Sequence, residues 1–269
     1  MNSDCAFYIG DTHEVCEDYA LASPSSIFLS DGCSSAVNTD IGSRILTSIA
    51  YKNVIDLEGE PPKEYISLQD YFNEVIYESR DVARQLGLTR DCLYATLLMA
   101  RVTKERILFH AFGDGAIALG KKDGTVKIVK IDFPSNAPRY LAYRLTLSDR
   151  DGFSAMDKGR VISEYQIDKG ICTKLSTKKE PSYDYEDLYA MSYKRDEYDW
   201  VSIVSDGVFS FLHPNEKEVP LTEVFRDLFC FKNFQGKFVQ RRLKRFLQNY
   251  HKNRKINYDD ISMAAINLG

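Results

Sequence analysis

Short apolar runs dominate the pattern along the chain and predict β-strands. Alternating or continuously apolar stretches of this length are typical of strands that are half or fully buried. The clearest runs cover residues 27–30, 96–102, 107–112, 116–120, 125–131, 200–205 and 261–267. Lys121-Lys122-Asp123-Gly124 separates two of these runs and predicts a tight hairpin, because Asp-Gly favours such turns.

Helical periodicity appears in four other segments. Thr39 is expected to cap the first helix. Ser67 and Asp70 form a capping-box pattern ahead of the second helix, which is expected to end at Gly87. The two later helices are expected over residues 221–231 and 236–252.

The order of these elements indicates the fold class. Strands come first, followed by two helices, many strands, two more helices and a final strand. Because the middle strands follow one another without helices between them, antiparallel pairing is favoured over a doubly wound parallel sheet. We therefore expect an α+β fold, a four-layer αββα sandwich of two antiparallel sheets flanked by helix pairs. Residues 1–269 are expected to form one domain, with the Tyr-rich and charged segment 176–199 as a surface flap.

Composition narrows the functional classes. The 35 basic and 39 acidic residues give a net charge of −4, which argues against a general nucleic-acid binder. The six cysteines are irregularly spaced and do not indicate a disulfide framework. The beginning of the chain lacks the pattern of a signal peptide, and no apolar run approaches the ~20 residues that span a bilayer. We expect a reduced, cytoplasmic protein that does not enter a membrane.

Acidic residues stand at the ends of several apolar runs. They are Asp31, Asp114, Asp206, Asp259, Asp18 and Glu17. Carboxylates gathered at strand ends repel one another unless a cation lies among them. With only four histidines, a hard cation with oxygen ligands is favoured over zinc. Asp-Gly is also the commonest dipeptide of tight turns, so a purely structural role for each Asp-Gly stays open at this point.

A series of segments, taken in order, resembles the motifs of the metal-dependent Ser/Thr protein phosphatases of type 2C (the PPM family), in particular its compact bacterial branch. These segments are Gly10-Asp11-Thr12-His13 with Cys16-Glu17-Asp18, Asp31-Gly32-Cys33-Ser34-Ser35-Ala36 with Asp40-Ile41-Gly42-Ser43-Arg44, Ala95-Thr96-Leu97-Leu98, Phe112-Gly113-Asp114-Gly115, Asn136 to Leu141, Ser205-Asp206-Gly207, and Asp259-Asp260-Ile261-Ser262. No single motif is specific, but their order over nearly the whole chain is. The family fold is a β-sandwich with helices on each face, which agrees with the order of elements.

The resemblance implies two Mg²⁺ or Mn²⁺ ions at one edge of the sandwich. It places Asp31 between the two ions, with help from the Gly32 carbonyl. It assigns one ion to Asp206 and Asp259. The remaining implied ligands are Asp18 with Glu17 for the second ion, and Asp114 with Asp206 for a possible third.

The chain departs from the family pattern at two positions. Cys33 stands directly after the first Asp-Gly, where many members carry His as the candidate general acid. A nucleophilic role for Cys33 is not favoured, because the C-x5-R signature of such enzymes is absent. His13 is the side chain nearest to the position where many members carry a phosphate-binding Arg. Together with Asp31 and Asp206, His13 is the candidate catalytic residue, and the alternative is a hydrogen-bonded turn residue.

The implied reaction is hydrolysis of phospho-Ser/Thr by a water that bridges the two ions. It implies a phosphorylated protein as substrate and an opposing Ser/Thr kinase as partner, and we expect a monomer. Two alternatives stay open: a pseudophosphatase that binds phosphoproteins, and a phosphomonoesterase for a small molecule. The basic run 241–245 is expected to be a solvated helix face or a dock for an acidic partner, whereas His110 and Trp200 are expected in the core.

Overall fold

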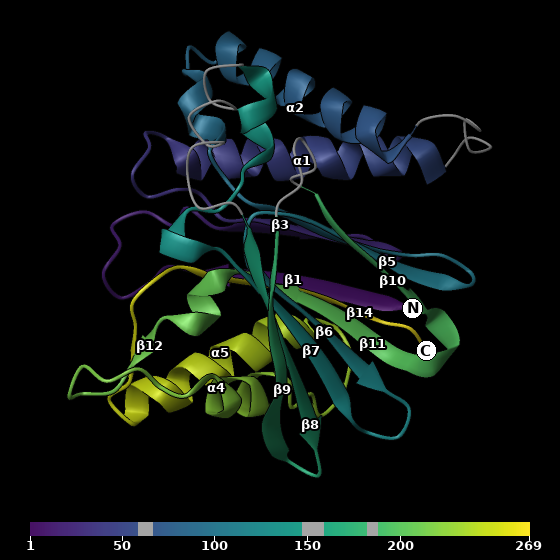
Figure 1. The fold of residues 1–269 in the computed structure, drawn as a ribbon, viewed down its shortest axis with the longest axis vertical. Helices are drawn as coiled ribbons and strands as arrows, with labels where there is room; N and C mark the ends of the chain where they lie inside the picture. Colours follow the sequence, from purple (N-terminus) through teal and green to yellow (C-terminus); the bar gives the residue numbers. More distant parts are fainter. Residues whose placement is uncertain (59–66, 147–158, 182–187) are drawn as a thin grey trace.

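The computed structural model describes residues 1–58, 67–146, 159–181 and 188–269. Two sheets pack face to face between two pairs of helices (Figure 1). The helices α1 (Thr39–Glu58) and α2 (Leu68–Gln85) cover one sheet. The helices α4 (Leu221–Leu228) and α5 (Phe238–Lys252) cover the other. These layers confirm the predicted αββα sandwich.

The larger sheet has seven strands, and every neighbouring pair is antiparallel. Its strands are β1 Asn2–Tyr8, β6 Gly115–Lys121, β7 Val126–Asp132, β8 Arg160–Asp168, β9 Ile171–Glu180, β11 Tyr198–Val204 and β14 Ile261–Asn267. Their spatial order is β1-β14-β11-β6-β7-β8-β9, so the two ends of the chain lie side by side in β1 and β14. The predicted final strand matches β14 at both ends.

The smaller sheet has five strands, also antiparallel. Its strands are β2 Tyr19–Ala22, β3 Ser26–Ser30, β4 Leu97–Val102, β5 Arg106–Phe112 and β10 Tyr189–Lys194, in the spatial order β10-β5-β4-β3-β2. A two-stranded sheet joins β12 Phe211–Leu212 to β13 Ile256–Asn257. Short 3-10 helices are η1 Arg90–Leu93, η2 Pro134–Asn136, η3 Leu141–Leu145, η4 Arg195–Glu197 and η5 Asp206–Phe209.

Local signals set the helix ends. Ser67 Oγ accepts from the Asp70 amide while the Asp70 carboxylate accepts from the Ser67 amide, which confirms the capping box of α2. Gly87 follows the last turn with a φ of +74°, as predicted for the residue after a helix. Thr39 is the first residue of α1 rather than its cap, and its hydroxyl donates to Glu17 instead. Helix α4 ends at Leu228 rather than at residue 231.

Three apolar layers hold the sandwich together. Fully buried side chains such as Leu29, Phe109 and Ile203 lie between the sheets. Phe72 of α2 packs edge-on against Phe112, with 4.8 Å between ring centroids. Each large apolar side chain buried in this way stabilises the fold by about 1.5–3 kcal/mol. No helix among the described residues combines the length and apolar character needed to cross a membrane.

Where it is described, the segment 176–199 is mostly sheet rather than a flap. Residues 176–180 complete β9, and residues 189–199 form β10, η4 and the beginning of β11. Residues 182–187 lie outside the described part of the chain. The predicted hairpin between β6 and β7 is confirmed, because Gly124 has a φ of +86° and the Asp123 carboxylate accepts from the Thr125 amide.

Candidate active site

Strand register places two of the predicted acidic residues at the same end of the smaller sheet. Tyr19, the first residue of β2, pairs with Ser30, the last residue of β3. Asp18 and Asp31 are the residues just outside this pair. They therefore lie side by side although a turn and two strands separate them in the chain.

The larger sheet contributes three more carboxylates at its corresponding edge. Val204, the last residue of β11, pairs with the beginning of β6 and with the beginning of β14. Asp206 follows β11, Asp114 precedes β6 and Asp259 precedes β14. Antiparallel pairing thus brings the ends and the beginnings of these strands together.

A cavity of about 220 Å³ opens where the two sets of strand ends meet. Asp31, Gly32, Asp114, Asp206 and Asp259 all line it. The other predicted ligands, Asp18 and Glu17, and the candidate acid His13 are not among its lining residues. The structure therefore brings five of the predicted site residues around one space and places the other three beside it.

Asp18 is fully buried and half satisfied. Its Oδ2 accepts from Ser205 Oγ at 2.7 Å, whereas its Oδ1 has no hydrogen-bond partner. Asp206 Oδ1 is likewise buried without a partner. A buried carboxylate oxygen left unpaired destabilises the fold by about 1–3 kcal/mol or more. Both oxygens are therefore candidate ligands for a bound cation.

Mutual repulsion among the carboxylates is strong. Burial, followed by the negative charges of Asp18 and Asp206, holds the pKa of Asp31 well above its usual range. Burial, followed by the negative charge of Asp206, raises the pKa of Asp114 in the same way, and burial raises the pKa of Asp259 to about 6. Within the described residues, His13 is the one basic side chain that lies within 4 Å of any of these carboxylates, at 3.5 Å from Asp259.

The donor set fits the metals that the sequence implies. It consists of carboxylate oxygens, two of which, on Asp18 and Asp206, are buried and unpaired. No basic side chain is found among the described residues that line the cavity. Oxygen ligands of this kind suit Mg²⁺ or Mn²⁺. A cation there would relieve both the unpaired oxygens and the repulsion that raises the pKa values.

Asp260 holds the N-terminal loop against this site. Its carboxylate accepts from the Gly10 amide at 2.7 Å and from the Glu17 amide at 2.5 Å. His13 Nδ1 lies 3.2 Å from the same carboxylate. His13, Glu17 and Asp260 form the one described group of three ligand-type residues whose atoms lie within 4.8 Å of one another. The segment that carries Glu17 and Asp18 is thus fixed by a residue from the other end of the chain.

Other polar contacts orient the acidic side chains. Glu17 Oε1 accepts from Thr39 Oγ1 at 2.6 Å, which aims Glu17 at the beginning of α1. The Asp31 amide donates to Thr96 Oγ1 at 3.0 Å, and the Thr96 amide donates back to the Asp31 carbonyl at 2.8 Å. These two bonds fix the backbone of Asp31 against the strand that follows in the sheet.

Glycines make two of the acidic turns possible. A methyl group added at Gly207 would lie 1.7 Å from the carbonyl oxygen of Asp260, so only glycine lets η5 approach β14 this closely. Asp114 stands between Gly113 and Gly115, whose φ values are +92° and +132°. Glycine is therefore required after Asp206 for steric reasons, and beside Asp114 because the backbone there has a positive φ.

Cys33 lies at the cavity beside Tyr140. Its sulfur is 3.0 Å from Ser35 Oγ, and its amide donates to the Tyr94 carbonyl at 2.8 Å. Burial and the neighbouring Cys33 raise the pKa of Tyr140, so this phenol stays protonated. The Asn136 to Leu141 motif meets the site here, because Asn136, Pro138 and Tyr140 also line the cavity.

Sequence reasoning did not assign site roles to Thr96, Tyr140 and Ser205, which the structure places around the carboxylates. It expected Thr39 only as a helix cap, whereas Thr39 bonds Glu17. Thr96, Tyr140, Ser205 and Asp260 all stand inside motifs that the sequence singled out, and that was the available signal. By contrast, His110 and Trp200 are buried as predicted, and burial lowers the pKa of His110 to about 4.

Comparison with known proteins agrees with this fold. No curated protein sequence matches the chain. The solved serine/threonine phosphatase PstP/Ppp of Mycobacterium tuberculosis is 13% identical with a TM-score of 0.54, and the match covers 99% of this chain and 97% of that one. Stp1 of Staphylococcus aureus is 12% identical with a TM-score of 0.55, covering 100% and 96%. The catalytic domain of PstP in complex with two manganese ions is 11% identical with a TM-score of 0.50, covering 98% and 96%.

At these identities the solved structures show a shared fold. The family itself is shown by sequence, because the profile of the protein phosphatase 2C family matches residues 11–248. The resemblance seen in the motifs is confirmed by this match. The chain therefore belongs to the protein phosphatase 2C family, whose members are metal-dependent Ser/Thr protein phosphatases.

Proposed function

We propose that the acidic cavity hydrolyses phosphoserine and phosphothreonine in proteins with two bound Mg²⁺ or Mn²⁺ ions. The observation that carries this proposal is the pair of buried, unpaired oxygens on Asp18 and Asp206 beside a cavity lined by further carboxylates. Ions held there supply Lewis acidity, which lowers the pKa of a coordinated water and neutralises charge that develops on the phosphoryl oxygens.

Different side chains are proposed to bind the different ions. Asp31 is the proposed bridging ligand, with the Gly32 carbonyl beside it. The remaining proposed ligands are Asp206 and Asp259 for one ion, Asp18 and Glu17 for the other, and Asp114 with Asp206 for a third ion. The hydrogen bonds from Ser205 to Asp18 and from Thr39 to Glu17 support this assignment, since they fix one oxygen of each carboxylate and leave the other available.

His13 has a positioning role in this proposal. Its two ring nitrogens face Asp260 at 3.2 Å and Asp259 at 3.5 Å, and its side chain is 22% exposed. It does not line the cavity, so the leaving group meets solvent rather than this imidazole. His13→Gln is expected to raise the Mn²⁺ concentration needed for half-maximal activity more than it lowers kcat at saturating Mn²⁺. The opposite split would restore His13 as the acid.

The size of the cavity favours a protein substrate over a small molecule. Sites that enclose a small organic ligand usually measure about 300–1,000 Å³. This cavity of about 220 Å³ suits a phosphoryl group with its ions and leaves the rest of the substrate on the surface. A phosphorylated side chain of a protein fits that arrangement.

The test is Mn²⁺-dependent release of phosphate from a phosphothreonine peptide. Asp206→Asn is expected to lower kcat at least about a hundredfold, because it removes a ligand and a charge from the site. Asp123→Asn is the matched control, since Asp123 also stands in an Asp-Gly turn but is exposed in the β6–β7 hairpin. Full turnover by a folded Asp206→Asn protein would refute the assignment, and absence of Mn²⁺ binding by calorimetry would favour a phosphoprotein-binding module.

Three finer points are proposals on the same basis. Turnover of phosphoproteins calls for an opposing Ser/Thr kinase, which we propose as the partner. The cytoplasmic location and the monomeric state predicted from the sequence stay predictions, and light scattering on the purified chain tests the latter.

A further inference from the structure

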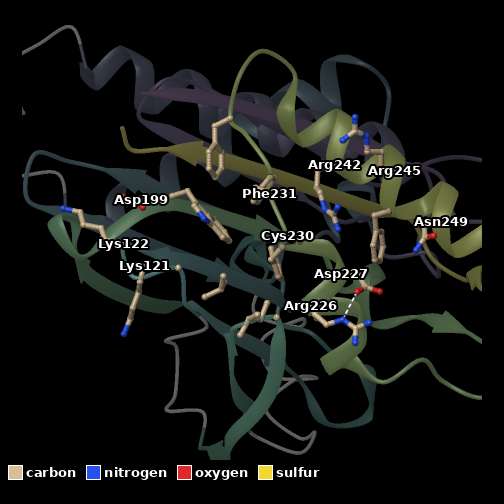
Figure 2. Close-up of a pocket in the computed structure, with 18 residues that line it drawn as sticks. Lys121, Lys122, Asp199, Arg226, Asp227, Cys230, Phe231, Arg242, Arg245 and Asn249 are labelled. Carbon is tan, nitrogen blue, oxygen red and sulfur yellow. Dashed lines mark hydrogen bonds and ion pairs between the residues drawn. The ribbon is translucent and has the colours of Figure 1, made fainter.

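A second cavity, of about 750 Å³, opens on the outer face of the larger sheet (Figure 2). It lies between the β6–β7 hairpin, α4, α5 and the connection between these two helices. The basic run at 241–245 contributes Arg242 and Arg245 to its wall. These residues have no role in the proposed phosphatase reaction. This cavity is distinct from the acidic one, since the two share no lining residue in the described part of the chain.

Two strands separate the cavities along their length. Strand β6 begins directly after Asp114 and ends at Lys121, which lines the second cavity. Strand β11 likewise carries Trp200 near its beginning and leads to Asp206 after its end. At about 3.3 Å per strand residue the two cavities lie roughly 20 Å apart. A molecule in the second cavity therefore leaves the acidic site accessible.

The floor of the second cavity is aromatic. Trp200 and Phe229 are buried and stack on each other, with 6.2 Å between ring centroids and 25° between planes. The half-buried rings of Phe231 and Phe234 close around Trp200 at 5.1 and 6.3 Å. Trp200 and Phe229 already stack on each other, so no gap remains between their rings for the base of a nucleotide. The floor instead offers an apolar surface.

The rim is cationic and largely unpaired. Figure 2 shows Lys121 and Lys122 on one side of Phe231, and Arg242 and Arg245 on the other. None of these four side chains has an ion-pair partner among the residues that the structure describes. The remaining charges on the wall nearly cancel: the Arg226 and Asp227 side chains pair at 2.8 Å, and Asp199 is the one other acid among the described lining residues. The cavity thus carries a clear excess of positive charge.

Arg242 is the most constrained of the four cations. Its Nε donates to the Leu228 carbonyl at 2.7 Å, which leaves the terminal N–H groups of the guanidinium without a bond in the described part of the chain. Burial lowers the pKa of Arg242, which reflects the loss of solvent around this cation. A desolvated cation is stabilised by an anion that replaces its lost hydration.

The spacing of the cations identifies the kind of anion. A compact phosphate needs several donors that converge on one point, whereas here the four cations stand on opposite sides of an apolar floor. An extended chain with carboxylates along it and one apolar side chain between them matches both features. We propose that this cavity is a docking site for an acidic segment of a partner protein that places an aromatic or aliphatic side chain on this aromatic floor.

The first experiment measures binding with no reference to catalysis. The probe is a fluorescein-labelled peptide of roughly twelve Asp and Glu residues with one central Phe, long enough to span the cavity at about 3.3 Å per residue. The double variant Lys121→Glu/Arg245→Glu is compared with Lys104→Glu/Lys244→Glu, which makes the same change in net charge at exposed positions outside the cavity. We expect the first to weaken Kd at least about tenfold and the second to change it less than about twofold.

The second experiment locates the bound peptide. Cys230 is exposed and lines this cavity, whereas Cys33 lines the acidic one. The peptide is expected to slow alkylation of Cys230 by a maleimide severalfold, as measured by mass spectrometry, and to leave alkylation of Cys33 unchanged. Hydrolysis of a small aryl phosphate should be the same in both double variants. Peptide binding and Cys230 alkylation are measured without phosphatase activity, so a failed phosphatase assignment would leave both results standing.

Several outcomes would overturn the proposal. Equal loss of affinity in the two double variants would show attraction by net charge alone. Unprotected Cys230 would place the peptide elsewhere. Equal binding of a peptide with Gly in place of Phe would remove the role of the floor, and protection of Cys230 by ATP but not by the peptide would make the cavity a nucleotide site.

Discussion

Replacing Asp18 with Asn separates the stability of the metal-free protein from its response to metal. Asp18 is completely buried, one of its oxygens has no partner, and Asp206 and Asp260 are close enough to raise its pKa further. An asparagine keeps the shape and still accepts the hydrogen bond from Ser205. It removes the charge, and its amide can donate to the acidic neighbours.

The magnitude follows from the environment of this carboxylate. An unsatisfied buried polar group costs about 1–3 kcal/mol, so Asp18→Asn should stabilise the metal-free protein by about that amount. A domain of this size shifts its melting temperature by roughly 2 °C per kcal/mol, which gives an increase of about 2–6 °C. The wild-type protein should instead gain about 2.7 kcal/mol from Mn²⁺ at a hundred times its Kd, and the variant should lose most of that gain.

Differential scanning fluorimetry with EDTA and with Mn²⁺ measures both effects. Asp196→Asn makes the same chemical change at an exposed position and should leave both melting temperatures unchanged. If Asp18→Asn destabilised the metal-free protein, the carboxylate would be satisfied by contacts within the fold. If the variant kept the full Mn²⁺ shift, Asp18 would have no part in holding an ion.

Three further predictions concern the same edge of the sandwich. Gly207→Ala should destabilise the protein by about 3 kcal/mol and lower kcat sharply, because the new methyl group meets the Asp260 carbonyl at 1.7 Å; urea unfolding and phosphopeptide turnover measure the two effects. Cys33→Ser should keep kcat within about threefold of wild type, since catalysis as proposed uses no thiol, and a hundredfold loss would reveal one. The melting temperature of the metal-free protein should rise as the pH falls from 7.5 towards 5.5. The raised pKa values of the buried carboxyls of Asp18, Asp31, Asp114 and Asp259 mean that the folded state binds these protons more readily than the unfolded state does. Together they outweigh the opposite contribution of buried His110, whose pKa is lowered to about 4; a falling melting temperature would contradict this.

Of the described strands, the interior ones other than β8 were predicted from the sequence, whereas β8 and the strands at the sheet edges were not. The residues of β3 and nearly all of those in β6 are buried, so their apolar runs are continuous. Strand β9 pairs only with β8 at the edge of the larger sheet, and most of its residues are exposed. Its sequence lacks the alternation of apolar and polar residues and is rich in charged residues. Charged side chains are one means by which natural edge strands avoid further pairing. The same property made the segment 176–199 resemble a flap.

The candidate site shows the limit of reading motifs. A carboxylate after an apolar run is visible in the sequence, and the structure does bring Asp31, Asp114 and Asp206 to one cavity. Charge and spacing alone could not distinguish the two residues of Asp259-Asp260, and only the family resemblance selected Asp259 as a ligand. Neighbouring residues in extended backbone face opposite ways, and here Asp259 lines the cavity while Asp260 turns to the amides of the N-terminal loop. That division depends on contacts between opposite ends of the chain.

This long-range contact ties assembly of the site to completion of the fold. The loop before Asp18 is held by Asp260, and strand β1, which precedes that loop, pairs along its whole length with β14, which follows Asp260. Among the described residues β1 pairs in its sheet with β14 alone, and the loop after it is also held by the hydrogen bond from the Asp11 amide to the Asn257 carbonyl of β13. Contacts between distant parts of a chain tend to form late, since closing a long loop costs entropy before the contact compensates for it. We therefore expect the ligands near the N-terminus to meet Asp206 and Asp259 only when both ends of the chain have paired, which keeps the carboxylates apart until the surrounding fold can hold them together.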